Sequence, residues 1–213
     1  MKSVLIIGLG RFGRHMAQKF IENGHEVMAV DHSEDRADAA VGLIQRILIG
    51  DATDERFMES LGIKNFDLAV VAVGENFQTV LEITVLLKDL GCKYIVARAT
   101  RDVHKKLLLR NGADYVTYAE REIAERLAIK FGADNIFDYV ELTPEIGIYE
   151  IAVPEKWRGK SMVELSIRNK YHVSVLATKK QDKIFPLPNP DHVFAAQESI
   201  MVMGTAKDIR AIT

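Results

Sequence analysis

The stretch S-V-L-I-I-G-L-G-R-F-G, Ser3–Gly13, decides the fold of this chain. Its run of valine, leucine and isoleucine predicts a strand that is buried on both faces. The run ends in the spacing Gly8, Gly10, Gly13, where a helical pattern begins. Gly8 allows a tight turn, Gly10 lets a pyrophosphate approach the backbone, and Gly13 lets the helix lie close to the strand. The stretch therefore predicts a phosphate-binding turn, with the free N–H groups of the helix facing the phosphates.

The sequence after the turn supports this interpretation. Met16, Phe20 and Ile21 share one face of a helix, and a second strand, Glu26 to Val30, is followed by the acid Asp31. Asp31 comes 18 residues after Gly13, close to the usual position of the acid that bonds a ribose hydroxyl. No arginine follows Asp31 directly, which disfavours a 2′-phosphate and therefore NADP. The alternative is a nucleotide-free α/β domain whose glycines serve packing alone.

Length and composition bound the class of protein. A chain of 213 residues suggests one full domain and a smaller partner domain. With 48% hydrophobic and 27% charged residues it is typical of globular proteins, and no apolar run approaches the roughly 18 residues that cross a bilayer. Cys92 is the only cysteine and no signal peptide precedes the first strand, so we expect a cytoplasmic location. A net charge of −2 gives no general attraction for nucleic acid.

Strand-like and helix-like segments alternate up to residue 117, which predicts a Rossmann-like, doubly wound parallel sheet. The most apolar strand, Leu68–Val73, belongs in the centre of this sheet. The other strands are expected at Arg46–Ile49, Tyr94–Ala97 and Tyr115–Thr117, and the helices at Glu34 to about Val41, Asp54–Leu61, Phe77–Leu90 and Asp102–Leu109.

A further helix, Glu120–Phe131, follows the completed sheet and must bury its apolar stripe of Ile123, Leu127 and Phe131 against another surface. All five prolines and the only tryptophan lie beyond residue 143, so we place a domain boundary near Asp138. We therefore expect a Rossmann-like domain over residues 1–118, a crossover helix and subunit-interface segment over 119–138, and a smaller α+β lobe over 139–213. In that lobe we expect strands at Ile146–Val153, His172–Thr178 and Ser199–Met203, helices at Ser161–Ile167 and from Ala206, and an exposed loop at Pro186–Pro190.

Several polar residues belong to the crevice outside the carboxyl ends of the strands, where such sheets bind ligands. The guanidinium of Arg11 at the helix N-terminus could bond a terminal phosphate, which favours ADP or ATP over NAD(H); the alternative is a solvated arginine. The other residues at strand ends are Asp51, Ala52, Thr53, Val73, Gly74, Glu75 and Arg98.

The sequence gives little indication of catalysis. Its six histidines are scattered, with no metalloprotease or nucleophile motif. A hydride-transfer enzyme needs an acid or base over the nicotinamide, and no distinctive residue of this kind stands in the second lobe. We therefore expect no enzymatic activity, and a small NAD-dependent oxidoreductase is the alternative. Glu120 and Glu122 could ligate a metal ion or simply cap the helix that they open.

Taken together, these motifs resemble the cytoplasmic regulatory subunits of Ktr/Trk potassium uptake systems, which consist of RCK (regulator of K⁺ conductance) domains with TrkA-N and TrkA-C lobes. The N-lobe landmarks are Gly8–Gly13, Val30-Asp31, Ala52-Thr53, Val73-Gly74, Gly112–Asp114 and Ala119-Glu120. The C-lobe is matched by G-K-S-M-V-E-L-S-I-R, Gly159–Arg168, and by the proline-rich loop.

The resemblance implies a nucleotide site. Arg98 replaces a lysine of close Ktr relatives, and Asp51 is typical of Trk-like members, so the choice between ADP/ATP and NAD(H) stays open. The implied nucleotide-binding residues are Gly8, Gly10, Arg11, Phe12, Gly13, Asp31, His32, Ser33, Asp51, Ala52, Thr53, Val73, Gly74, Glu75, Arg98, Ala99, Thr100, His104 and Glu120.

The resemblance also implies partners. The crossover helix would pair subunits, the pairs would close into an octameric ring, and the ring would gate a membrane potassium transporter. Glu120 could hold a divalent cation beside the nucleotide. Met162, Val163 and Arg168 match positions that bind cyclic di-AMP in related C-lobes; the alternative is two core residues and a surface cation.

Overall fold

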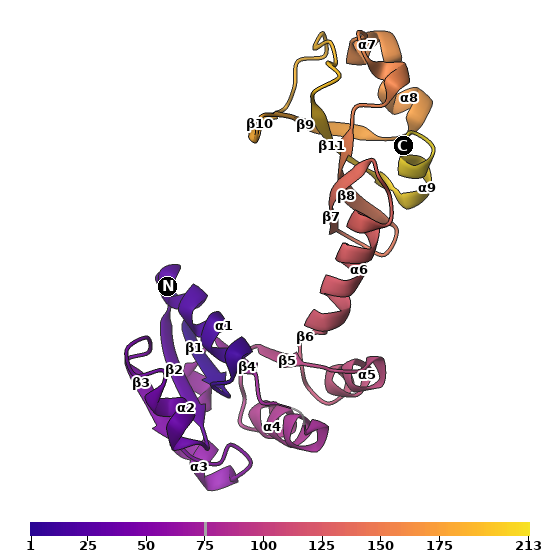
Figure 1. The fold of residues 1–213 in the computed structure, drawn as a ribbon. Helices are drawn as coiled ribbons and strands as arrows, with labels where there is room; N and C mark the ends of the chain where they lie inside the picture. The colour runs from indigo at the N-terminus through magenta and orange to yellow at the C-terminus, as the bar shows by residue number, and fades with distance from the viewer. Residues whose placement is uncertain (75) are drawn as a thin grey trace. The chain divides into compact units, whose positions relative to one another are not determined.

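A computed structural model of the chain describes residues 1–74 and 76–213. The chain divides into two compact units, Met1–Glu120 and Arg121–Thr213 (Figure 1). A parallel sheet lies in the first unit, with a hydrophobic core on each face, and an antiparallel sheet with one core lies in the second. The prediction of a Rossmann-like sheet with a smaller α+β lobe is confirmed.

The first unit is built on six parallel strands in the order β3-β2-β1-β4-β5-β6. Chain order runs outward from β1 to β3 on one side and from β4 to β6 on the other, so the direction of winding reverses between β1 and β4. Such a switch point opens a crevice at the carboxyl ends of the strands. The strands are β1 (Ser3–Ile7), β2 (Glu26–Asp31), β3 (Arg46–Ile49), β4 (Leu68–Val71), β5 (Ile95–Arg98) and β6 (Tyr115–Thr117).

The side chains of β1 explain its central place. Leu5 and Ile7 belong to one core, Val4 and Ile6 to the other, and all four are at most 1% exposed. Because successive side chains of a strand point to opposite faces, this run is buried on both sides of the sheet, as the sequence predicts.

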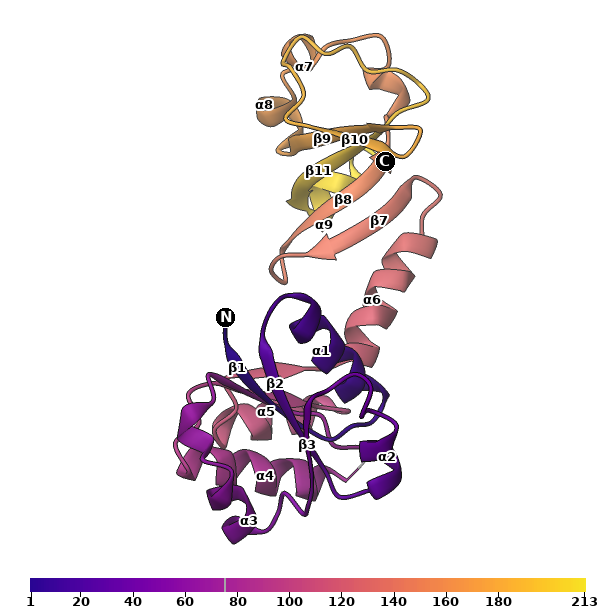
Figure 2. The ribbon, with the colours of Figure 1, turned by 90° about the vertical axis from the view of Figure 1, so that its left-hand side faces the viewer.

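Helices cover both faces of the parallel sheet (Figure 2). Ala17 of α1 packs in the core that holds Val4, while Ile83 of α4 and Leu108 of α5 pack in the core that holds Leu5. The helices are α1 (Arg11–Glu22), α2 (Glu34–Asp38), α3 (Glu55–Ser60), the 3₁₀ turn η1 (Ile63–Asn65), α4 (Phe77–Asp89) and α5 (Asp102–Arg110).

Two predicted elements of this unit are too long. The helix expected from Glu34 to about Val41 ends at Asp38, because the chain tightens there into turns in which the Ala40 N–H bonds the Ala37 carbonyl. The strand expected over Leu68–Val73 ends at Val71, the partner of the last residue of β1. The Ala72 N–H still donates to the Ile7 carbonyl at 2.7 Å, but β1 turns away at Gly8, so the ladder does not continue to Val73.

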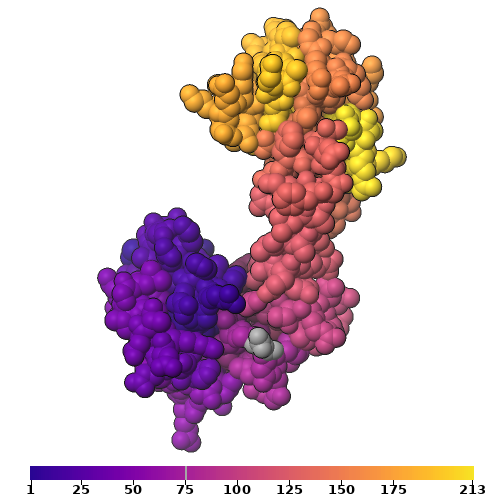
Figure 3. All heavy atoms as spheres, viewed as in Figure 1, coloured from indigo at the N-terminus to yellow at the C-terminus, as the bar shows by residue number. Residues whose placement is uncertain are grey.

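Helix α6 (Ala119–Phe131) includes the boundary between the two units. None of its residues is buried, and it lies at the surface on the face seen in Figure 3. The side chains of its expected apolar stripe are 58% (Ile123), 45% (Leu127) and 78% (Phe131) exposed. The three apolar residues of the predicted stripe are thus exposed among the described residues.

The second unit contains an antiparallel sheet in the order β10-β9-β11-β8-β7 (Figure 2). Its core surrounds Trp157 and Phe194, both fully buried. The strands are β7 (Ile136–Glu141), β8 (Ile146–Ala152), β9 (Ser174–Lys180), β10 (Lys183–Pro186) and β11 (Ser199–Thr205), and the short helices are η2 (Glu155–Trp157), α7 (Met162–Leu165), α8 (Ile167–Tyr171) and α9 (Ala206–Arg210).

The sequence analysis missed two of these strands and two of the short helices, one of them η2. β7 occupies the segment around Asp138 that we expected to join two domains. β10 is a short edge strand, every residue of which is exposed, so it lacks the apolar alternation of a half-buried strand. The single helix expected over Ser161–Ile167 is two helices, because Ser166 adopts a left-handed conformation with φ 46°.

Candidate functional site

The glycine turn between β1 and α1 is shaped by close backbone contacts. Gly8 has φ +100°, and a Cβ there would lie 2.8 Å from backbone atoms of Ala72 and Val73. A Cβ on Gly13 would lie 1.8 Å from the Gly8 carbonyl oxygen. By contrast, Gly10 has φ −63°, and a Cβ there would meet no protein atom within 4 Å. The packing of this unit thus requires Gly8 and Gly13, whereas Gly10 faces open space.

Asp31 joins this turn to the end of β2. Its side chain is 1% exposed, and its two oxygens accept the N–H groups of Leu9 (2.6 Å) and Ser33 (2.9 Å). His32 Nδ1 lies 3.5 Å and Arg36 Nη1 lies 3.9 Å from the carboxylate. Asp31 therefore fixes two turns at once, at the edge of the crevice.

Asp51 follows β3 and is held by Thr53. Its carboxylate accepts hydrogen bonds from the backbone N–H (2.9 Å) and the hydroxyl (2.8 Å) of Thr53. These bonds lower the pKa of Asp51, the backbone bond most, because they stabilise the ionised form. The carboxylate is thus ionised at neutral pH.

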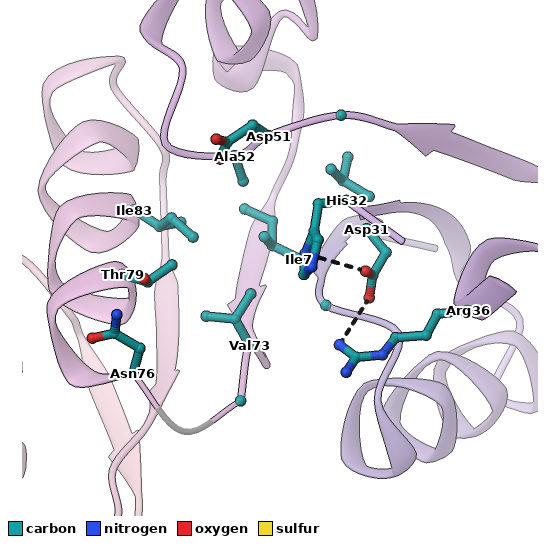
Figure 4. Close-up of a pocket in the computed structure, with 14 residues that line it drawn as sticks. Ile7, Asp31, His32, Arg36, Asp51, Ala52, Val73, Asn76, Thr79 and Ile83 are labelled. Atoms are coloured by element: carbon teal, nitrogen blue, oxygen red, sulfur yellow. Dashed lines mark ion pairs between the residues drawn. The ribbon is translucent and has the colours of Figure 1, made fainter. Parts of the chain in front are cut away.

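A cavity lies at this carboxyl edge (Figure 4). Asp31, His32 and Arg36 stand on one side of it and Val73, Asn76, Thr79 and Ile83 on the other. The predicted residues that line it are Gly8, Asp31, His32, Asp51, Ala52, Val73 and Gly74.

Seven further residues line the cavity, and sequence reasoning missed them. Thr79 and Ile83 are one turn apart on α4, so they lie on one helix face, and Arg36 lies in the short helix that follows Asp31. Thr79 and Ile83 lie in the helix after β4, and Arg36 lies in the helix after β2. The helical periodicity of these two segments could therefore have indicated all three residues. The remaining additions are Ile7, Val30, Gly50 and Asn76.

Arg98 and Glu120 form a separate cluster of predicted residues. Arg98, the last residue of β5, donates a hydrogen bond to the Glu120 carboxylate, and its guanidinium carbon lies 5.7 Å from the ring centre of Phe12 on α1. The pKa of Glu120 is lowered, first by its own backbone N–H and also by Arg98. Within residues 1–74 and 76–213, the buried Nε of Arg98 has no hydrogen-bond partner.

His104 is the centre of a small stack. Its ring lies on that of Phe77 with centroids 3.9 Å apart, and its Nδ1 is 3.3 Å from the Thr100 hydroxyl.

Neither Thr100 nor His104 lines the cavity. The same is true of the predicted residues Gly10, Arg11, Phe12, Gly13, Ser33, Thr53, Arg98, Ala99 and Glu120, while Glu75 lies outside the described residues.

The structure brings no metal centre together around Glu120. Among the residues described, no group of three or more histidine, cysteine, aspartate or glutamate side chains could hold a metal ion. Nor does the described part of the chain contain a helix long and apolar enough to cross a membrane.

The second unit has a groove of its own. It is lined by the three residues expected to bind a second ligand, Met162, Val163 and Arg168. Val163 is 59% exposed and Met162 only packs at the edge of the core, so the alternative of two ordinary core residues does not describe both. The other lining residues are Ser166, Ile167, Asn169, Val175, Leu187, Pro188 and Pro190.

Two family profiles match the chain. The TrkA-N domain matches residues 4–119 and the TrkA-C domain matches residues 147–213.

Relatives extend over nearly the whole chain. The chain is 36% identical to the Ktr system potassium uptake protein C of Bacillus subtilis (strain 168), over 98% of this chain and 94% of that protein. It is 34% identical to the Ktr system potassium uptake protein A of the same organism, with the same coverage.

Solved structures share the fold. A GsuK channel bound to NAD matches 99% of this chain and 38% of the channel chain, with a TM-score of 0.70 and 18% identity. The Kef C-terminal domain of Shewanella denitrificans in its AMP-bound form matches 60% of this chain and 78% of that chain, with a TM-score of 0.52 and 29% identity.

Proposed function

Since the chain belongs to the family of Ktr and Trk potassium uptake proteins, we propose that it is the regulatory subunit of a potassium uptake system. In this proposal the first unit binds an adenine nucleotide, and binding is coupled to a membrane potassium transporter on its cytoplasmic side. The subunit performs no reaction itself. The alternative of a small NAD-dependent oxidoreductase gains nothing from relatives that are potassium uptake proteins.

The observation that carries the proposal is the open space at Gly10. Gly8 and Gly13 are explained by packing, but Gly10 is not, and it stands at the N-terminus of a twelve-residue helix. Helix N-termini attract phosphate through their free N–H groups and their dipole. A phosphate beside Gly10 would explain why no side chain stands there.

The cavity would then take the nucleoside. At about 250 Å³ it is smaller than most sites that enclose a whole ligand, so it suits one part of a nucleotide. We assign the ribose hydroxyls to Asp31 and the adenine to the pocket beside Asp51 and Ala52. The AMP-bound Kef domain supports an adenine nucleotide as the ligand class.

ADP or ATP ranks before NAD(H) because of two arginines. Arg11 is exposed on the first turn of α1, and no carboxylate of residues 1–74 and 76–213 lies within 4 Å of it. Arg98 keeps a buried Nε without a partner in the same residues. Terminal phosphates would satisfy both. A divalent cation brought by these phosphates would find Glu120 as its protein ligand.

Calorimetric titration with ATP, ADP and NAD tests the ligand. We expect Arg11→Ala to weaken ATP binding about tenfold or more, since a charge-assisted bond contributes about 1.5–3 kcal/mol, and to weaken NAD binding less. Arg110→Ala, at the exposed end of α5, is the control. Equal losses for ATP and NAD would overturn the ranking, and no binding of any nucleotide to the wild type would overturn the site.

Assembly belongs to the same proposal. The uncovered stripe Ile123, Leu127 and Phe131 would pair two subunits, and the pairs would form an octameric ring. Light scattering tests this: a monomer at micromolar concentration, with and without nucleotide, would contradict it, and Leu127→Glu should reduce the mass of the wild-type assembly.

The groove of the second unit is proposed as the site for cyclic di-AMP. Arg168 offers a cation at a groove that also has apolar walls from Met162 and Val163. Titration of the full chain with cyclic di-AMP tests this, with Arg168→Ala expected to abolish binding. Unaltered binding by Arg168→Ala, or none by the wild type up to high micromolar concentration, would refute it.

A further inference from the structure

The peptide units on either side of Leu9 are held from opposite sides. The Leu9 N–H donates to Asp31 Oδ2 at 2.6 Å, and the Leu9 carbonyl accepts a hydrogen bond from Arg14 Nη1 at 2.9 Å. The Leu9 side chain is fully buried in the core. The N–H, the carbonyl and the side chain of Leu9 are therefore all held in place, although Leu9 lies inside a glycine-rich turn.

The Arg14 bond fixes more than Leu9. The Leu9 carbonyl and the Gly10 N–H belong to one planar peptide unit, so the direction of one sets the direction of the other. Within the described part of the chain, the Gly10 N–H has no acceptor. By holding the carbonyl, Arg14 also holds the direction of this free N–H.

The helix dipole disfavours a positive charge at the position of Arg14. The first turn of α1 contains no acidic residue, and an arginine there is repelled by the positive end of the helix. No carboxylate in residues 1–74 and 76–213 pairs with Arg14. A residue that breaks the charge rule of a helix without an ion-pair partner points to a role at a functional site.

We propose that Arg14 is a positioning residue for phosphate binding, acting through the Leu9–Gly10 peptide. This rests on the proposed nucleotide site. Asp31 orients the preceding peptide unit and Arg14 the following one, so the turn meets a phosphate without rearranging. Arg14 need not touch the nucleotide.

Titration of Arg14→Met with ADP, NAD and adenosine tests the role. We expect ADP and NAD to bind about tenfold more weakly, which is the factor typical of losing one hydrogen bond between the turn and a charged phosphate. Adenosine has no phosphate, so we expect it to bind to the variant as it binds to the wild type. The factor should be the same at low and high salt, since the effect is one of geometry rather than long-range charge. Arg110→Met should change none of these affinities.

Amide hydrogen exchange gives a readout without ligand. In Arg14→Met the Leu9 amide, which donates to Asp31, should exchange faster while the amides of β2 and β4 do not change. If the variant fails to fold, Arg14→Gln, which keeps one donor on a shorter side chain, should show both effects at smaller size.

Three outcomes would overturn the proposal: unchanged ADP affinity, a loss that disappears at high salt, or an equal loss for adenosine. These differ from failure of the nucleotide site itself, in which the wild type would bind neither ADP nor NAD.

Discussion

The two candidate sites of this protein are built in different ways. The cavity of the first unit is fixed by backbone contacts at Gly8 and Gly13 and by a buried carboxylate, Asp31, that accepts two N–H groups. The groove of the second unit is bordered by exposed side chains, with Leu187 87% and Val163 59% exposed. The first site is preorganised without ligand, whereas the second leaves apolar surface for a ligand or partner to cover.

The sharpest test of preorganisation is Gly13→Ala. A Cβ 1.8 Å from the Gly8 carbonyl oxygen forces β1 and α1 apart, so we expect a loss of about 3 kcal/mol or more in the free energy of unfolding, or no folded protein. Gly10→Ala is the matched control, because its Cβ meets nothing and an alanine at an N-cap costs less than about 1 kcal/mol relative to glycine. Thermal unfolding followed by circular dichroism measures both, and similar losses would show that close packing does not decide the turn.

Asp31→Asn should have the next largest effect. An amide has one oxygen where the carboxylate has two, so either the buried N–H of Leu9 or the part-buried N–H of Ser33 loses its acceptor, at a cost of about 2 kcal/mol. Thermal unfolding measures the loss. Asp51→Asn, in which the affected bonds are exposed, should cost clearly less, and the reverse order would contradict the structural role of Asp31.

In the second unit, pH should act through Asp138. Its hydrogen bonds with Arg126 lower the pKa of the Asp138 carboxyl, so the pair stabilises the fold above the unfolded pKa and loses its effect as pH falls through the folded pKa. Solvent screens this exposed pair, so we expect only about 0.5–1 kcal/mol near neutral pH. Urea unfolding followed by fluorescence of the buried Trp157 should show wild type and Asp138→Asn differing near neutral pH and converging as pH falls through the lowered pKa of Asp138. A difference that grows on acidification would be contrary to the account.

The smallest effect is expected at the rim of the groove. Leu187 has φ 50° and lies between two prolines, so glycine should relieve backbone strain and change stability by no more than about 0.5 kcal/mol in either direction. The same Trp157 fluorescence measures it. If Leu187→Gly lost several kcal/mol in the free energy of unfolding, the Leu187 side chain would belong to the core. The contrast between a preorganised cavity and an exposed groove would then be wrong.

The same contrast explains what the sequence could predict. In the first unit the strands are continuous apolar runs and the turn has a fixed glycine spacing, so local patterns were sufficient to predict the sheet and the residues at strand ends. β7 and β10 were missed because they are the two edge strands of the antiparallel sheet and have mixed composition, although each pairs with its neighbour in the chain, β7 with β8 and β10 with β9. The separation of Arg98, His104 and Glu120 from the cavity also depends on side-chain directions that no spacing reveals.

The most direct test of the regulatory role is potassium flux into vesicles that contain the partner transporter and this protein. With the wild type, flux should differ between ATP and ADP, because only a ligand that favours one conformation can shift an equilibrium. With Gly10→Val, which places a side chain in the open space of the turn, the two nucleotides should give the same flux. Identical flux with ATP and ADP for the wild type would contradict the account.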